Sequence, residues 1–251
     1  MLRGLLAFAA VAIAAACVDL STDLDAVAAI EFGELAWPSI VAGDTLRDST
    51  GAAARLRARL YDGNGDEVTA EVEFISQDKD VRVVDGSLVV ADDKASGTAR
   101  LLASTSGIQS IVRQLEVVAA PESLAAEGTV SPLSWVVPDD PALNTSVALG
   151  VRVLDGAGQG VRSWVVTFEL NIRGQVVARS DTSHVFLVNE AGRPSYADTT
   201  DTQGIASRKV RLRIAAGLVA PDSAVVTVRA SHRGTALRGS AIRLVLPIRP
   251  G

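Results

Sequence analysis

The sequence is poor in the side chains that carry most enzyme chemistry. Its 251 residues include one cysteine, Cys17, and two histidines, His184 and His232. A single cysteine can form neither an intramolecular disulfide nor a cysteine-based zinc site. With two histidines, few residues could serve as the general base of a Ser-His-Asp catalytic triad. The composition therefore predicts a non-enzymatic protein with no catalytic site, no cofactor and no bound metal.

Positive charge, aromatic residues and long apolar runs are scarce as well. The net charge is −5, so bulk charge does not favour a nucleic-acid partner. Aromatic residues make up 4% of the chain although 48% is hydrophobic, and the abundant valine suits strands. The run from Leu5 to Ala16 is shorter than the roughly 20 apolar residues that a membrane-spanning helix needs.

The amino terminus has the order of a secretory signal. One positive charge, Arg3, precedes the apolar run, which ends in Ala14-Ala15-Ala16 directly before Cys17. This arrangement resembles the lipobox of bacterial lipoproteins, although the family prefers leucine where Ala14 stands. The resemblance implies a signal peptide over 1–16, a tether over 17–25 and lipid attachment at Cys17. The alternative is plain cleavage after Ala-x-Ala, with Cys17 as an incidental thiol.

Lipidation would make the membrane a partner through the anchor and would export the protein. Val18 follows Cys17, and the aspartate that favours inner-membrane retention in enterobacteria is missing there. We therefore expect an outer-membrane or cell-surface lipoprotein, with a periplasm-facing placement still open.

The rest of the chain has the period-two pattern of strands. In Trp164–Ile172, the side chains Trp164, Val166, Phe168 and Leu170 share one face, which predicts a sheet with one buried side. The same logic puts alternate residues inward in four further segments, namely 56–60, 147–153, 210–214 and 242–246. The predicted fold is all-β, built from antiparallel sheets.

An internal repeat predicts two domains. Leu60–Val68 and Val153–Val161 each place an Asp-Gly-x-Gly turn between strands, and each continues toward a phenylalanine, Phe74 or Phe168. Leu35-x-Trp37 and Leu133-x-Trp135 are a fainter echo, which suggests equivalent positions for Trp37 and Trp135. A boundary near Ala119–Glu122 divides the chain into 26–118 and 119–251, two tandem immunoglobulin-like β-sandwiches.

These motifs resemble bacterial immunoglobulin-like (Big) domains. Residues 26–118 are similar to the second Big group through Val41–Thr45, Leu56–Asp62, Val72–Ser76 and Gly97–Ala99. Residues 121–247 are similar to the invasin and intimin type through Val151–Val161, Val166–Phe168 and Thr200–Ala206. The resemblance implies a fold and no particular ligand.

Residues 172–200 are longer than the corresponding section of the family. Because long loops on a rigid sandwich commonly carry binding sites, this segment is the first place where we expect a ligand.

Two short motifs invite a chemical interpretation. Asp62, Asn64, Asp66 and Glu73 approximate a calcium-loop spacing, but Glu67 stands where that loop needs glycine, so a hairpin turn is the preferred interpretation. Ser76 and Lys79 have the Ser-x-x-Lys spacing of penicillin-interacting enzymes. No Lys-Thr-Gly accompanies them, and we attribute the match to chance.

The histidines and tryptophans complete the candidates. His184 and His232 each have a serine nearby in sequence, yet each is more simply a polar loop residue. Trp37, Trp135 and Trp164 could stack on a sugar. A core or domain-junction role is expected instead, with Trp164 on an inward face.

The leading hypothesis is a lipid-tethered module that presents Ig-like domains for adhesion, assembly or spacing, with an unidentified protein or glycan as ligand. A carbohydrate-binding accessory protein is the alternative, and a hydrolase ranks third.

Overall fold

The computed structural model describes residues 26–214 and 219–251. The predicted signal peptide, tether and lipid site at Cys17 lie outside them. The regular elements of the described residues are all β-strands, which confirms the all-β prediction. In the described part of the chain, no helix is both long and apolar enough to cross a membrane.

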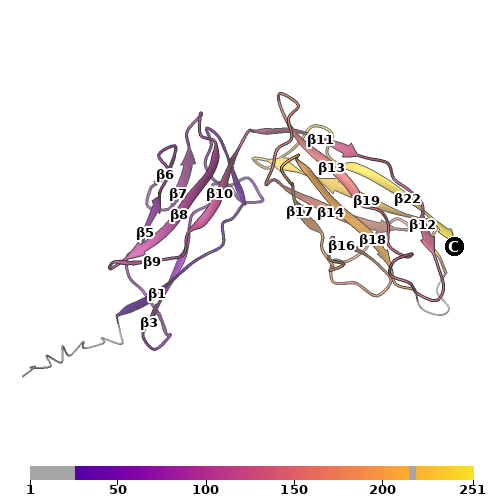
Figure 1. Cartoon of the computed structure of the whole chain (residues 1–251), viewed down its shortest axis with the longest axis horizontal. Helices are drawn as coiled ribbons and strands as arrows, with labels where there is room; N and C mark the ends of the chain where they lie inside the picture. Colours follow the sequence, from indigo (N-terminus) through magenta and orange to yellow (C-terminus); the bar gives the residue numbers. More distant parts are fainter. Residues whose placement is uncertain (1–25, 215–218) are drawn as a thin grey trace, which may run out of the picture.

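Ten strands form what we call the N-terminal sandwich (Figure 1). They are β1 (Val27–Phe32), β2 (Ser39–Val41), β3 (Ala58–Asp62), β4 (Glu67–Val68), β5 (Glu73–Ser76), β6 (Val81–Val84), β7 (Leu88–Ala91), β8 (Gly97–Thr105), β9 (Ile108–Gln109) and β10 (Arg113–Val118). The sheet β2-β10-β8-β5, with β9 on β8, faces the sheet β1-β3-β4 and the hairpin β6-β7. Buried residues from all these layers, among them Phe32, Val89 and Leu101, form one core.

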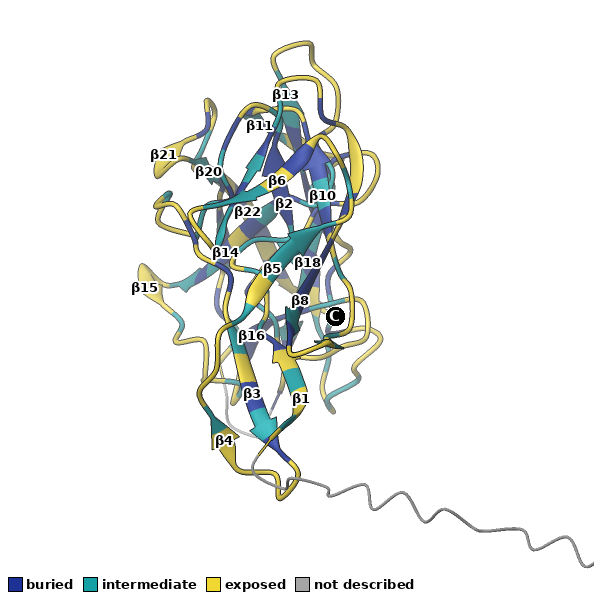
Figure 2. Cartoon of the chain, turned by 90° about the vertical axis from the view of Figure 1, so that its left-hand side faces the viewer, coloured by how far each residue is buried: buried dark blue, intermediate teal, exposed yellow. Residues whose placement is uncertain are grey.

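Twelve strands form the C-terminal sandwich. They are β11 (Pro121–Glu127), β12 (Leu133–Trp135), β13 (Leu149–Asp155), β14 (Val165–Ile172), β15 (Gln175–Val176), β16 (Val185–Val188), β17 (Ala197–Thr199), β18 (Ile205–Leu212), β19 (Ser223–Arg229), β20 (Ser231–His232), β21 (Thr235–Ala236) and β22 (Ile242–Pro250). One sheet has the order β11-β13-β18-β16, and the other the order β12-β22-β19-β14-β15 with β17 on β14. Figure 2 shows buried residues along the longer strands, whereas the turns and the short strands β15 and β21 are exposed.

The predicted repeat recurs in the strand pairing. The short strands β2 and β12 run parallel to the last strands, β10 and β22, and β1 and β11 pair antiparallel with β3 and β13. The two turns also match: Asp62 Oδ1 accepts N–H groups of Asn64 and Asp66, both at 2.9 Å. Asp155 Oδ1 accepts those of Ala157 and Gln159 at 2.9 and 2.8 Å. The chain is a tandem pair of immunoglobulin-like sandwiches.

Most inward positions are as predicted. Val166, Phe168 and Leu170 are at most 1% exposed. Val147 is an exception, because it is 52% exposed. Asn144 and Ser146 are the buried residues before it, so the alternation changes phase before β13 begins at Leu149.

Residues 172–200 are not the single long loop that their length suggested. This segment contains β15, β16 and β17, and it moves from one sheet to the other and back. Arg208, whose side chain points inward from β18, contacts the end of this segment. The guanidinium is 7% exposed, lies 2.8 Å from Asp198 Oδ2 and donates to Ser195 Oγ at 2.9 Å. The segment therefore completes the sandwich edges.

Phe168→Ala should lower the free energy of unfolding of the C-terminal sandwich by about 3–5 kcal/mol, because truncating a buried phenylalanine removes packing and leaves a cavity. Chemical denaturation measures the loss. The exposed neighbour Thr167 provides the control, Thr167→Ala, which should cost far less. Similar losses for both variants would contradict the assigned inward face.

Candidate functional site

The two sandwiches contact each other directly at a junction. Only Ala119 and Ala120 lie between β10 and β11, and side chains on both sides of this link are in contact. Ser39 Oγ donates to the carbonyl of Ser163 at 2.7 Å, and Arg162 Nη2 lies 2.7 Å from Glu116 Oε2. Val41 and Val118, from the N-terminal sandwich, join the core of the C-terminal one. Figure 1 shows the resulting bent, end-to-end arrangement.

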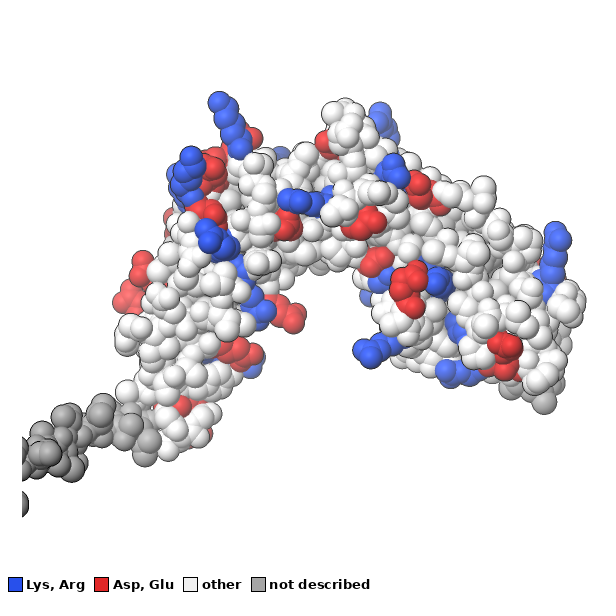
Figure 3. Space-filling model, viewed as in Figure 1, with Lys and Arg blue, Asp and Glu red and all other residues white. Residues whose placement is uncertain are grey.

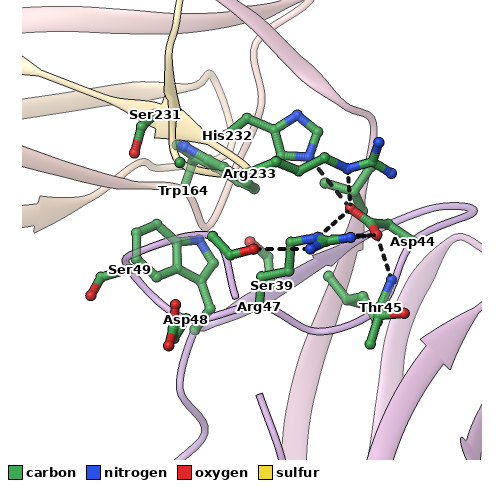
Figure 4. Close-up of a pocket in the computed structure, with 15 residues that line it drawn as sticks. Ser39, Asp44, Thr45, Arg47, Asp48, Ser49, Trp164, Ser231, His232 and Arg233 are labelled. Carbon is green, nitrogen blue, oxygen red and sulfur yellow. Dashed lines mark hydrogen bonds and ion pairs between the residues drawn. The ribbon is translucent and has the colours of Figure 1, made fainter. Parts of the chain in front are cut away.

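Asp44 is the central charged residue of this junction (Figure 4). Its side chain is 5% exposed and receives Arg47, from its own sandwich, through Nη2 at 2.9 Å and Nε at 3.0 Å. Arg233, from the turn between β20 and β21, donates through Nε at 2.8 Å. The N–H of Thr45 adds a bond at 2.7 Å. The carboxylate therefore ties two segments 189 residues apart.

A tight turn presents Asp44 to these partners. Gly43, two residues after the end of β2, adopts a positive φ of 74°, and the N–H of Asp44 donates to the carbonyl of Val41 at 3.0 Å. Burial alone would raise the pKa of Asp44, but hydrogen bonds from Arg47, Arg233 and Thr45 hold it well below its usual range. Asp44 is thus a permanent anion at the junction.

An aromatic cluster lies beside the carboxylate. The rings of Trp37 and Trp164 meet edge to face with centroids 5.6 Å apart, and Trp164 meets the imidazole of His232 at the same separation. Trp164 is 5% exposed, so neither of its faces is free for a sugar. The cavity left among these groups is only about 20 Å³, which is room for about one water molecule.

His232 does not have the environment of a general base. Its Nε2 lies 3.6 Å from Asp44 Oδ2, but that carboxylate already accepts two guanidinium groups and an N–H. Burial lowers the pKa of His232, and the cation of Arg233 lowers it further. In the described contacts no serine hydroxyl bonds to this imidazole. The interpretation of His232 as a polar loop residue is wrong, since it lies in β20 with 19% of its side chain exposed.

The backbones also approach closely at the junction. A Cβ on Gly51 would lie 2.2 Å from the N atom of Gly234, and one on Gly234 would lie 2.7 Å from the carbonyl oxygen of Thr50. Arg47 Nη1 donates to the carbonyl of Gly51 at 2.9 Å, which holds this loop in place. Only glycine fits where the two backbones meet.

The other predicted candidates are dispersed. Asp62 accepts backbone N–H groups in its turn, as the hairpin interpretation predicts. Residues 26–214 and 219–251 contain no group of three or more His, Cys, Asp or Glu side chains placed to bind a metal ion. Ser76 Oγ donates to the carbonyl of Asp78, and Lys79 is exposed. His184 is exposed, while the nearby Ser183 hydroxyl donates to Asp181.

Trp37 and Trp135 are not equivalent. Trp135 is the last residue of β12 and lies opposite Pro250. The corresponding pair in the N-terminal sandwich is Val41 and Val118, so the residue equivalent to Trp135 is Val41 and not Trp37. Trp37 precedes β2 and reaches the junction, whereas Trp135 packs against the core of the C-terminal sandwich, so each has one of the two expected roles. Sequence reasoning missed Asp44 and Arg233, because no local pattern links residues so far apart.

Comparisons with known proteins identify no family. No protein-family model matches the chain, and no curated protein sequence does either. Among solved structures, the Yersinia pseudotuberculosis adhesin InvE matches 84% of this chain and 56% of its own, at 18% identity and a TM-score of 0.35.

Two structures of the surface-layer protein SbsC match as well. Domains 4–9 match 90% of this chain and 30% of their own at 14% identity and a TM-score of 0.31. Domains 5–6 match 90% and 98% at 16% identity and a TM-score of 0.29. The chain therefore spans less than a third of the domain 4–9 structure and about half of the adhesin. At these scores the likeness carries no argument about function.

His232→Asn should flatten the pH dependence of stability between about pH 8 and pH 5. The pKa of His232 is lower in the folded protein than its usual 6.5, so the unfolded chain binds more protons in this range. Acidification therefore destabilises the folded state. The lowered pKa of Asp44 acts in the same direction, but only below the usual carboxyl value of 3.8.

Urea denaturation at several pH values measures this slope. Wild type should lose stability as the pH falls below about 6.5, and His232→Asn should lose less. The exposed His184 supplies the control, and His184→Asn should follow wild type. An unchanged slope in His232→Asn would count against the assigned burial.

Proposed function

We propose that this protein is a non-enzymatic, lipid-tethered module of the bacterial cell envelope that holds its C-terminal sandwich at a fixed distance and angle, for adhesion, assembly or spacing. The observation that carries this proposal is the junction. A two-residue link, an ion cluster around the buried Asp44 and a glycine contact restrict rotation between the sandwiches, whereas a flexible tether would have none of them.

The arrangement of the histidines supports a role without catalysis. His232 lies against a carboxylate that is already saturated, and the cavity beside it holds about 20 Å³, far less than the roughly 300–1,000 Å³ of a small-molecule site. The mutual packing of Trp37 and Trp164 lends no support to the alternative of a sugar-stacking platform.

The domain assignment belongs to the same proposal. Residues 26–118 would be a domain of the second Big group, and 119–251 one of the invasin type. In support, within the described residues no sheet combines a strand of 26–118 with a strand of 119–251.

Gly51→Ala should open the junction. Gly51 and Gly65 both have φ of +89°, but a Cβ on Gly65 meets nothing within 4 Å. Gly65→Ala therefore has the same backbone strain, about 1–2 kcal/mol, without the contact. Spin labels at Asn64→Cys and Ala191→Cys, in residues 18–251 that lack Cys17, report the distance between the sandwiches. The distribution should broaden in Gly51→Ala and stay narrow in Gly65→Ala.

A broad distribution in the protein without either glycine substitution would overturn the rigid-spacer proposal. Equal distributions in all three proteins would contradict the contact between Gly51 and Gly234.

Cys17→Ser should release the exported protein from the membrane. Two or three acyl chains hold a protein persistently, at about 0.8 kcal/mol per buried methylene, and without the thiol no diacylglyceryl group can be attached. Detergent-phase partitioning of the full chain measures this: wild type should enter the detergent phase and Cys17→Ser the aqueous phase. Identical partitioning would defeat the lipid anchor and would leave export by plain cleavage.

A further inference from the structure

A groove crosses the outer face of the C-terminal sandwich, on the sheet that ends in β16. One wall is the loop at Pro141, and the other is the turn after β16, from Asn189 to Gly192. The space between them is about 540 Å³, which is within the range of ligand sites. None of the junction residues lines this groove.

The floor alternates cations with buried apolar side chains. On β18, Val210 and Leu212 point into the core, so Lys209 and Arg211 point into the groove. Their partners across the ladder are Val188 and Phe186. These two side chains lie outside the core cluster yet are only 2% and 4% exposed, because the walls and cations cover them.

The two acidic partners of these cations differ in exposure. Arg211 forms a bidentate pair with Asp139, at 2.6 and 3.0 Å, and both side chains are at most 25% exposed. Glu190 pairs with Lys209 at 2.8 Å, but its side chain is 72% exposed at the tip of a turn. Such an exposed pair contributes little stability. Another carboxylate can replace Glu190 at small cost.

Arg213 leaves the groove with surplus positive charge. Its guanidinium stands 5.2 Å from the ring centroid of Phe186, and its hydrogen bond goes to the neutral carbonyl of Thr182 at 2.9 Å. Three cations, two on β18 and Arg213 directly after it, thus face two carboxylates. Figure 3 shows basic and acidic side chains close together on the lower part of this sandwich.

We propose that this groove binds a short acidic segment of an extended polypeptide. Its carboxylates would replace Glu190 at Lys209 and meet Arg213. An acidic glycan fits less well, because Phe186 is 4% exposed and offers no open ring face for stacking. This inference rests on the presenting role proposed above, to which it adds the kind of partner.

Fluorescence anisotropy with a labelled Glu-Glu-Leu-Glu-Glu peptide and residues 18–251 tests the proposal. Binding should weaken as salt increases, and a Gln-Gln-Leu-Gln-Gln peptide should not bind. Lys209→Gln and Arg213→Gln should each weaken binding about two- to fivefold, the range of exposed ion pairs.

Glu190→Gln should strengthen binding by a similar factor, because it removes the competing carboxylate, a result that a merely structural role for Glu190 would not produce. The control is Glu122→Gln, which removes another exposed acid of the same sandwich, paired with Arg238 at 3.3 Å, and should change nothing.

Three results would overturn the proposal: no binding of the acidic peptide, equal binding of the glutamine peptide, or no gain from Glu190→Gln. Direct binding of labelled hexagalacturonate, together with no binding of the acidic peptide, would assign the groove to a glycan instead. The distances between spin labels distinguish the two proposals, since a failure in the groove leaves a narrow distribution untouched.

Discussion

The arrangement of this molecule depends on one buried carboxylate. Removing a charge from water costs several kcal/mol unless it is paired and hydrogen-bonded, so Asp44 is stable at the junction only while Arg47, Arg233 and the N–H of Thr45 surround it. One of these partners belongs to the other sandwich. The requirement to satisfy one anion therefore becomes a constraint on the relative position of two folding units.

The neighbouring groups are consistent with this constraint. Trp164 belongs to the core of the C-terminal sandwich and also contacts Trp37, so the aromatic packing continues across the junction. Gly51 and Gly234 allow the backbones to approach closely enough for the guanidinium of Arg233 to reach Asp44. Charge, ring packing and backbone shape at the junction agree on one geometry.

Local pattern was sufficient for the sheets and insufficient for the site. Alternation identified the buried face of β14, and the Asp-Gly-x-Gly repeat identified two turns with the same hydrogen bonds. Alternation failed at Val147, where an irregularity shifts the phase of the pattern. The length of residues 172–200 suggested a loop, and the segment instead contains three strands. Asp44 and Arg233 pair over 189 positions, and period-two patterns carry no information about such a pair.

The parallel pairing of β2 with β10 and of β12 with β22 has a mechanical consequence. In each sandwich a strand near its beginning lies beside its last strand and runs in the same direction. A force that pulls the two ends of such a sandwich apart slides these strands past each other, so the hydrogen bonds between them are loaded in shear. They must break together, whereas the bonds of a hairpin pulled open at one end would separate one after another. The strand order of each sandwich is thus suited to bearing tension along the chain.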